Sequence, residues 1–223
     1  MSLVLVVAPH PDDETLGCGG TLLRHVCKGD EVYWLIVTDL SVDCGFPQLQ
    51  VIQRQEEIQQ VSKAYGFAEV YNLKLPPAQL EEFPKGKLVS LIGKIVKDVN
   101  PEIVYLPYRN DVHTDHRIVF DAVVSCSKWF RYPSIRRVLC YETLSETDFS
   151  LYPNLEGFTP NSFVDITNYM DKKIEIAKIY RTEMGQFPFP RSPEALQALA
   201  QVRGAASGCL AAESFIILRE IVK

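Results

Sequence analysis

The sequence lacks cysteine motifs and long apolar runs, the features that identify disulfide-rich, thiolate-metal and membrane proteins directly. Its six cysteines form no CxxC pair and show no regular spacing, which argues against a disulfide framework and against a metal site built from thiolates. The apolar run at residues 3–8 is far too short to cross a bilayer, and no small-residue cleavage site follows it. We therefore expect a cytoplasmic protein without a membrane anchor.

An excess of positive charge is also missing. The formal net charge is −5 and the isoelectric point is near 5.4, whereas nucleic-acid binders neutralise phosphates with basic residues. The most basic stretch, residues 128–137, is typical of a solvated helix face and loop. These observations favour a small-molecule partner over nucleic acid, and they leave the oligomeric state open, with a homo-oligomer as one alternative.

Nothing in the sequence divides the chain clearly. We find no internal repeat, no low-complexity tract and no long linker. A chain of 223 residues with 47% hydrophobic residues is long enough to bury one full core. We therefore expect a single domain over residues 1–223, made of a core at residues 1–141 and a C-terminal extension at residues 142–223 that contributes to the substrate site.

The periodicity of apolar residues predicts an alternation of strands and helices. Strand-like runs lie at residues 3–8, 31–38, 69–73, 103–106 and 138–141, and helical patterns lie between them at 16–28, 50–65, 87–99 and 115–130. Such alternation indicates parallel pairing through right-handed crossovers. The sequence therefore predicts an α/β fold with a doubly wound, mostly parallel sheet that carries helices on both faces.

The pattern becomes less regular after residue 142. A segment with proline and asparagine at 152–161 precedes a short apolar run at 163–166, and two helical patterns follow at 169–181 and 193–203. An apolar run at 214–222 ends the sequence.

A dense group of polar side chains follows the first predicted strand: His10, Asp12, Asp13 and Glu14. Carboxylates this close together repel one another unless a cation or a hydrogen-bond network compensates them. A purely structural interpretation is also available, in which His10 is a turn residue, Asp12 or Asp13 caps the next helix and Glu14 favours its positive end.

A second group follows the fourth predicted strand and contains His113, Asp115 and His116. In doubly wound sheets, ligands bind beyond the carboxyl ends of the strands at the point where the winding reverses, commonly between the first and fourth strands. Both groups are therefore expected at one edge of the sheet. Two histidines and a carboxylate that converge in a cleft are typical of a metal site.

Glycines 17, 19 and 20 raise the alternative of nucleotide binding. The dinucleotide fingerprint places its first glycine in the strand-to-helix turn, but here residues 10–14 occupy that turn. Close packing of the helix on the sheet, or space for the metal loop, explains the glycines better, and a nucleotide-binding protein stays the weaker alternative.

Two tracts resemble the signature motifs of the LmbE-like, or PIG-L, zinc-dependent N-deacetylases: Ala8-Pro9-His10-Pro11-Asp12-Asp13-Glu14 with Gly17-Cys18-Gly19-Gly20-Thr21, and His113-Thr114-Asp115-His116. The resemblance covers a Rossmann-like core of about 130 residues and extends to residues 54–66 and 212–215. It implies a hydrolase that removes the N-acetyl group from an amino sugar or an N-acetylglucosamine-type glycoconjugate.

The resemblance also assigns roles to residues. It implies that His10, Asp13 and His116 bind Zn²⁺, that Asp12 is the general base, and that His113 stabilises the oxyanion or donates a proton. In the same way it implies that Asp115 orients His113. Glu14 is expected to support this site from the start of the helix without binding the metal.

Several alternatives stay open at this point. Arg54 either contacts the substrate, as the resemblance implies, or forms a surface salt bridge with Glu57. Two histidines and a carboxylate also describe the Fe²⁺ site of non-haem oxygenases, so Fe²⁺ is an alternative metal. The alternative functions are a non-catalytic sugar- or nucleotide-binding module and a hydrolase of a different amide.

Overall fold

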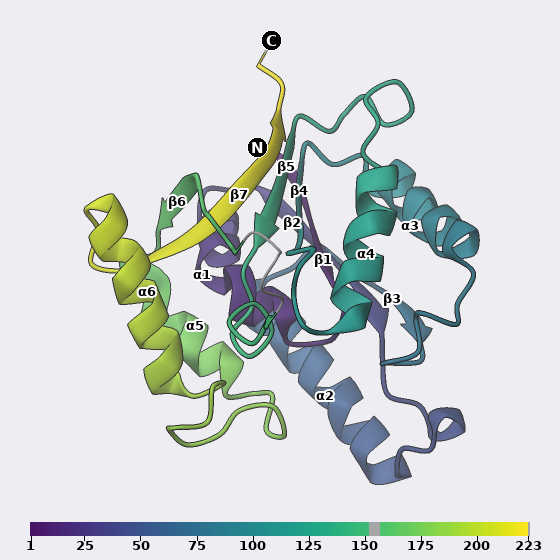
Figure 1. The fold of residues 1–223 in the computed structure, drawn as a ribbon, viewed down its shortest axis with the longest axis horizontal. Helices are drawn as coiled ribbons and strands as arrows, with labels where there is room; N and C mark the ends of the chain where they lie inside the picture. Colours follow the sequence, from purple (N-terminus) through teal and green to yellow (C-terminus); the bar gives the residue numbers. More distant parts are fainter. Residues whose placement is uncertain (152–156, 223) are drawn as a thin grey trace.

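The computed structural model describes residues 1–151 and 157–222 and contains one mixed sheet of seven strands (Figure 1). The strands are β1 (Leu3–Ala8), β2 (Glu31–Thr38), β3 (Glu69–Leu75), β4 (Ile103–Pro107), β5 (Arg137–Tyr141), β6 (Ser162–Asp165) and β7 (Ala212–Glu220). The α-helices are α1 (Asp13–Cys27), α2 (Gln48–Tyr65), α3 (Lys85–Val99), α4 (Thr114–Ser125), α5 (Met170–Ala177) and α6 (Pro193–Ser207). Two short 3₁₀ helices are η1 (Val42–Cys44) and η2 (Thr167–Tyr169).

The strand order β3-β2-β1-β4-β5-β7-β6 is that of a doubly wound sheet. The first five strands pair in parallel, whereas β7 runs antiparallel to β5 and β6 runs antiparallel to β7. The predicted α/β class with a mostly parallel sheet is therefore confirmed. The winding direction reverses between β1 and β4, which are direct neighbours.

Strand β1 shows how the sequence places helices on both faces. Val4 and Val6 pack into a cluster with side chains of α1, α2 and α5, whereas Leu5 and Val7 pack into another cluster with α3 and α4. Because alternate residues of a strand point to opposite faces, an unbroken apolar run is buried on both sides. Figure 1 shows α3 and α4 on one side of the sheet and α1 on the other.

The glycines of α1 allow that helix to lie close to its neighbours. A Cβ atom on Gly17 would lie 2.2 Å from Cδ2 of Tyr141, and one on Gly20 would lie 2.7 Å from Cγ2 of Ile166. Any larger residue would force these side chains to move. The predicted close packing at this tract is thus confirmed.

Some predicted boundaries were wrong. The helix predicted at 115–130 ends at Ser125, because the chain leaves the helical path at Cys126. The helix predicted at 169–181 is the shorter α5, preceded by η2. Residues 152–156 of the predicted irregular segment lie outside the described residues.

None of the helices in the described ranges combines the length and the apolar character that a bilayer crossing requires.

Candidate metal centre

Three side chains meet where β1 and β4 end. His10 follows β1, Asp13 begins α1, and His116 lies in the first turn of α4. Asp13 lies between the two rings: its Oδ2 is 3.3 Å from His10 Nδ1 and its Oδ1 is 3.3 Å from His116 Nε2. One nitrogen or oxygen atom from each residue lies within 4.8 Å of the other two, so the three residues form a group that can hold a metal ion.

The orientation of His116 favours a metal. Its Nδ1 lies 2.8 Å from Oδ2 of Asp111, and Oδ1 of Asp111 accepts a 2.6 Å hydrogen bond from Thr147. A carboxylate at Nδ1 fixes the proton there and leaves the Nε2 lone pair available. The Nε2 atom is fully buried and has no hydrogen-bond partner among the described residues. A buried nitrogen of this kind is explained by a bound cation.

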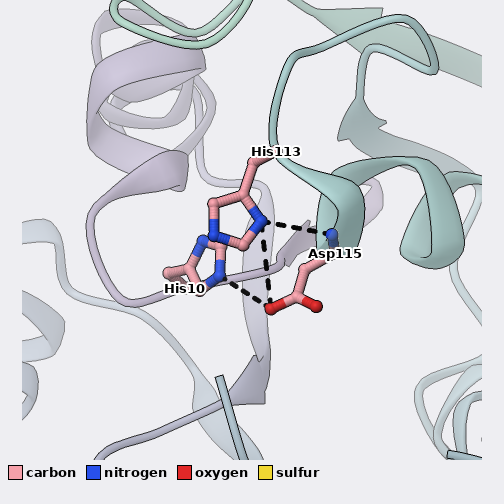
Figure 2. Close-up of side chains that lie close together, drawn as sticks. All are labelled: His10, His113 and Asp115. Carbon is pink, nitrogen blue, oxygen red and sulfur yellow. Dashed lines mark hydrogen bonds and ion pairs between the residues drawn. The ribbon is translucent and has the colours of Figure 1, made fainter. Parts of the chain in front are cut away.

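His10 is held from its other side by Asp115 (Figure 2). The Nε2 atom of His10 lies 3.1 Å from Oδ2 of Asp115, which also accepts a 2.7 Å hydrogen bond from the backbone N–H of Ala78. Its Oδ1 accepts a 3.2 Å hydrogen bond from the N–H of Leu80. Each histidine of the metal group thus has a carboxylate on the ring nitrogen that faces away from Asp13.

His113 lies beside His10, with ring centroids 4.4 Å apart. Its Nδ1 accepts a 3.1 Å hydrogen bond from the backbone N–H of Asp115, and the carboxylate of Asp115 lies 4.0 Å away (Figure 2). A neutral His113 ring therefore carries its proton on Nε2. Burial and the charges of His10 and His116 lower the pKa of His113 to about 4.

Asp12 is buried next to this group but outside it. Its backbone has φ 146°, a conformation that non-glycine residues rarely adopt. Although it precedes α1, its side chain makes no capping hydrogen bond, and its Oδ2 instead accepts a 2.9 Å hydrogen bond from Nη1 of Arg191. Burial, followed by the charges of Asp13 and Glu183, raises the pKa of Asp12 well above its ordinary value.

The charges of the metal group depend on one another. Burial by itself lowers the pKa of His10, but hydrogen bonds with Asp115 and Asp13 raise it to about 9. Burial opposes ionisation of Asp13, yet His116 and His10 hold the pKa of Asp13 below its usual range. The group therefore attracts positive charge, which a proton supplies in the absence of a divalent cation.

Glu14 supports the turn that carries Asp12 and Asp13. Its Oε2 accepts a 3.1 Å hydrogen bond from the N–H of Asp12, and its Oε1 accepts a 2.7 Å hydrogen bond from the hydroxyl of Tyr180. Burial raises the pKa of Glu14 to about 7. Glu14 does not belong to the group of His10, Asp13 and His116 that can hold a metal ion.

Arg54 of α2 contacts the turn that precedes α1. Its Nη1 donates a 3.0 Å hydrogen bond to the carbonyl oxygen of Pro11, its Nε lies 3.1 Å from Glu57, and its Nη2 pairs with Glu183. The predicted salt bridge with Glu57 is present, but it is buried rather than exposed. The guanidinium group also lies at the cavity next to the metal group.

That cavity has a volume of about 190 Å³. His10, Asp12, Asp13 and His113 are among the residues that line it, together with residues far along the chain. The complete lining is His10, Pro11, Asp12, Asp13, Leu16, Thr38, Asp39, Leu40, Arg54, Pro77, His113, Thr143, Ser145, Glu146, Glu183 and Arg191.

Helix α1 is broken directly after the residues that it brings to the site. Cys18 has φ −143° and ψ 20°, which interrupts the helical hydrogen bonds. In an intact helix, the N–H of Gly20 would donate to the carbonyl of Leu16. Instead that N–H donates to Glu213 at 2.8 Å, and the carbonyl of Leu16 accepts from Nζ of Lys173 at 3.0 Å. Lys173 and Glu213 also pair with each other at 2.7 Å, so a buried ion pair replaces the lost bond.

Sequence reasoning did not assign a role to four of the residues described above. Asp111 lies five residues before His116, and a carboxylate in a ligand-bearing loop is a signal that could have identified it. Glu146, Glu183 and Arg191 lie in the less regular part of the chain, where no spacing marks them.

Comparison with known proteins agrees with this geometry. The chain is 27% identical over 195 residues to diacetylchitobiose deacetylase of Thermococcus kodakarensis, and the alignment covers 83% of this chain and 70% of that protein. It is 24% identical over 188 residues to a probable N-acetyl-alpha-D-glucosaminyl L-malate deacetylase 2 of Bacillus anthracis, covering 81% of this chain and 80% of that protein.

A solved structure extends the similarity to the whole fold. The conserved protein TT1542 from Thermus thermophilus superposes with a TM-score of 0.79 at 26% identity, and the match covers 100% of this chain and 97% of that chain. A family model described as PIG-L, GlcNAc-PI de-N-acetylase, matches residues 5–127 of the 223. This chain therefore belongs to the PIG-L, or LmbE-like, family.

Proposed function

We propose that this protein is a zinc-dependent hydrolase that removes the N-acetyl group from an amino sugar or an N-acetylglucosamine-type glycoconjugate. The observation that carries the proposal is the buried Nε2 of His116, which makes no hydrogen bond among the described residues and shares one group with Asp13 and His10. The carboxylate of Asp12 lies beside this group but outside it. The deacetylase relatives support the same reaction.

His10, Asp13 and His116 would hold the metal. When bound, a Zn²⁺ ion supplies a water molecule with a pKa near 7 and polarises an amide carbonyl. Three protein ligands leave positions for water and substrate, as is typical of catalytic rather than structural zinc. Fe²⁺ is the alternative occupant of the same donor set.

Asp12 would act as the general base that takes the proton of the attacking water. Its raised pKa suits this task, because a base whose pKa approaches the working pH is efficient in both accepting and returning a proton. The contact with Arg191 fixes the carboxylate and favours its ionised form. Asp12 is then able to deliver the proton to the departing amine nitrogen.

His113 would stabilise the oxyanion that forms when the amide carbonyl is attacked. Because its Nδ1 accepts the N–H of Asp115, a neutral ring presents an Nε2–H donor. A neutral donor is consistent with the low pKa of His113. Removing one donor of this kind typically lowers kcat by about 10²- to 10³-fold.

The C-terminal residues 142–223 are proposed to complete the same catalytic unit as residues 1–141. Glu183 and Arg191 line the cavity together with His10 and Asp12, which supports one functional domain. A cytoplasmic location and a homo-oligomeric state stay predictions from the sequence.

The test is substitution of Asp12 by asparagine in the zinc-loaded protein. We expect Asp12→Asn to retain its zinc, measured by elemental analysis, while release of free amine from N-acetylglucosamine and diacetylchitobiose falls by at least about 10²-fold. Asp171→Asn, on the exposed side of α5, is the matched control and should keep full activity. Full activity of Asp12→Asn would falsify the assigned base.

The same experiment distinguishes the alternative functions. A non-catalytic sugar- or nucleotide-binding module would bind the sugar or nucleotide but release no amine, whatever residue stands at position 12. A hydrolase of a different amide would be inactive on acetamido sugars, yet its activity on other amides would still require Asp12. Metal analysis after purification without oxygen separates Zn²⁺ from Fe²⁺.

A further inference from the structure

The charges of the active-site cavity bear on which substrates it accepts, provided that the proposed deacetylation is correct. Five carboxylate residues line the cavity, against two arginines. With all five carboxylates ionised, both lining histidines neutral and a divalent cation bound, the lining carries five negative and four positive charges. An anionic group of a substrate would therefore have to bind to one of these two arginines, Arg54 or Arg191.

Arg54 is already fully engaged. Its Nη1 contacts the carbonyl of Pro11, its Nε contacts Glu57 and its Nη2 contacts Glu183. The residue is 5% exposed. Binding a substrate anion would require Arg54 to leave a buried carboxylate without its partner, which is costly.

Arg191 is engaged through one nitrogen, while its buried Nε makes no hydrogen bond within the part of the chain that the structure describes. Its Nη1 lies 2.9 Å from Oδ2 of Asp12 and 3.1 Å from Oε2 of Glu183. Glu183 thus bridges the two arginines of the cavity. Moving Arg191 toward a substrate anion would release Asp12, the carboxylate that the reaction needs in place.

Glu146 differs from the other acids of the cavity. It forms no ion pair within the described ranges 1–151 and 157–222, and its side chain accepts only a 3.4 Å hydrogen bond from its neighbour Ser145. Ser145 has φ 73°, which is uncommon for a non-glycine residue. The N–H of Val112 donates to the carbonyl oxygen of Glu146, which ties this loop to the one that carries His113.

We infer that the cavity selects N-acetyl amino sugars whose acetamido ring carries uncharged substituents, and that Glu146 is the residue that discriminates against carboxylate- or phosphate-bearing sugars. A carboxylate that forms no ion pair repels a substrate anion and accepts hydrogen bonds from sugar hydroxyls. Glu183 pairs with both arginines, so part of the positive charge of each is already balanced inside the cavity.

The test compares two substrates that differ in charge at one position. The zinc-loaded protein is assayed with the methyl glycoside of N-acetylglucosamine and with N-acetylglucosamine 1-phosphate. We expect kcat/KM to be at least about tenfold higher for the methyl glycoside. Glu146→Gln should lower this ratio of kcat/KM values by about three- to tenfold, because a single nearby charge changes the binding of an anion by about that factor.

Glu102→Gln is the matched control. It removes the same charge directly before β4, at the opposite end of that strand from the site, and it should leave the ratio unchanged. A ratio near one in the native protein, or a ratio that Glu146→Gln does not alter, overturns the inference even though the deacetylation itself stands.

Failure of the proposed function gives a different result. If neither sugar releases an amine, deacetylation of acetamido sugars is wrong, and the charge selectivity is then measured as binding of the same two sugars to the zinc-free protein by calorimetry. Weaker binding of the phosphate, relieved by Glu146→Gln, still supports the selectivity, and equal or tighter binding overturns it.

Discussion

At the scale of single residues, the site depends on carboxylates that hold the rings of histidines. Asp111 fixes His116 and Asp115 fixes His10, so the nitrogen of each ring that faces Asp13 is presented with a defined orientation. This arrangement reduces the entropic cost of metal binding, because the rings of the proposed ligands are already held in place before a metal binds.

We predict that Asp111→Asn lowers the affinity for Zn²⁺ by about 10- to 100-fold, which is the usual effect of removing such a partner. The asparagine keeps the size of the side chain but no longer holds the proton on Nδ1 of His116 as strongly. A competition titration with a chromogenic chelator measures the change.

Asp98→Asn is the control, because Asp98 contacts Tyr71 on the surface far from the metal group in the fold. Zinc affinity of Asp111→Asn equal to that of Asp98→Asn would show that Asp111 does not orient the ligand.

The residues of the site differ in how far sequence could identify them. His10, Asp12, Asp13 and His116 follow predicted strands at short range, so local patterns and the topological rule bring them together. Arg191 gives no such signal, because its contact with Asp12 spans 179 positions and depends on how the chain after α5 folds back.

At the scale of secondary-structure elements, the break in α1 separates the first turn, which carries Asp13, from the rest of the helix. The ion pair of Lys173 and Glu213 is 3% and 5% exposed and is inserted at that break. The position of Asp13 therefore depends on α5 and β7 as well as on α1 itself.

We predict that Lys173→Met destabilises the protein by about 3–5 kcal/mol, because it leaves the buried carboxylate of Glu213 without a cation. It should also weaken zinc binding to the folded protein, since the first turn of α1 loses one of its anchors. Chemical denaturation and zinc titration below the unfolding transition measure the two effects separately.

Lys172→Met is a closely matched control, because the neighbouring Lys172 is exposed and pairs with Glu175 on the surface. It should change stability by less than about 0.5 kcal/mol. If the two variants were equally stable, the ion pair at the break would have no anchoring role.

The sequence predicted the existence of these elements better than their limits. The first, second, third and fourth helices were expected from apolar periodicity, which tertiary packing reinforces. The break at Cys18 was not expected, since it is stabilised by Lys173 and Glu213 from distant segments. The end of α4 was placed too late because the aromatic residues at 129 and 130, which extend the apolar pattern, are exposed in the fold.

At the scale of the whole molecule, metal binding is expected to be linked to folding. The donor group joins the end of β1 to the start of α4, and the unfolded chain cannot hold these residues together. A ligand that binds only the folded state stabilises it in proportion to the logarithm of its concentration.

We predict that Zn²⁺ at about 1,000 times its Kd raises the free energy of unfolding by about 4 kcal/mol. For a chain of this size, the midpoint of thermal unfolding should rise by about 8–16 °C. Calorimetry with and without zinc measures the shift, and a chelator should reverse it.

His116→Ala removes one ligand and should abolish most of that shift. A shift of the same size in His116→Ala would mean that zinc stabilises the protein from another site.

The overall topology was predictable only in part. Parallel pairing of the first five strands follows from the alternation of strands and helices. The antiparallel addition of β7 and β6 was not predicted, because two short apolar runs separated by helices do not reveal which strand they join.

The family model ends at residue 127, and this boundary divides the site. The three proposed metal ligands and Asp12 lie before it, whereas Glu146, Glu183 and Arg191 lie after it. The proposed chemistry therefore draws on both stretches of the chain, because Arg191 from the second holds the carboxylate of Asp12 from the first. We therefore expect that exchange of the second stretch changes the accepted substrate and keeps the chemistry only where a cation is retained opposite Asp12.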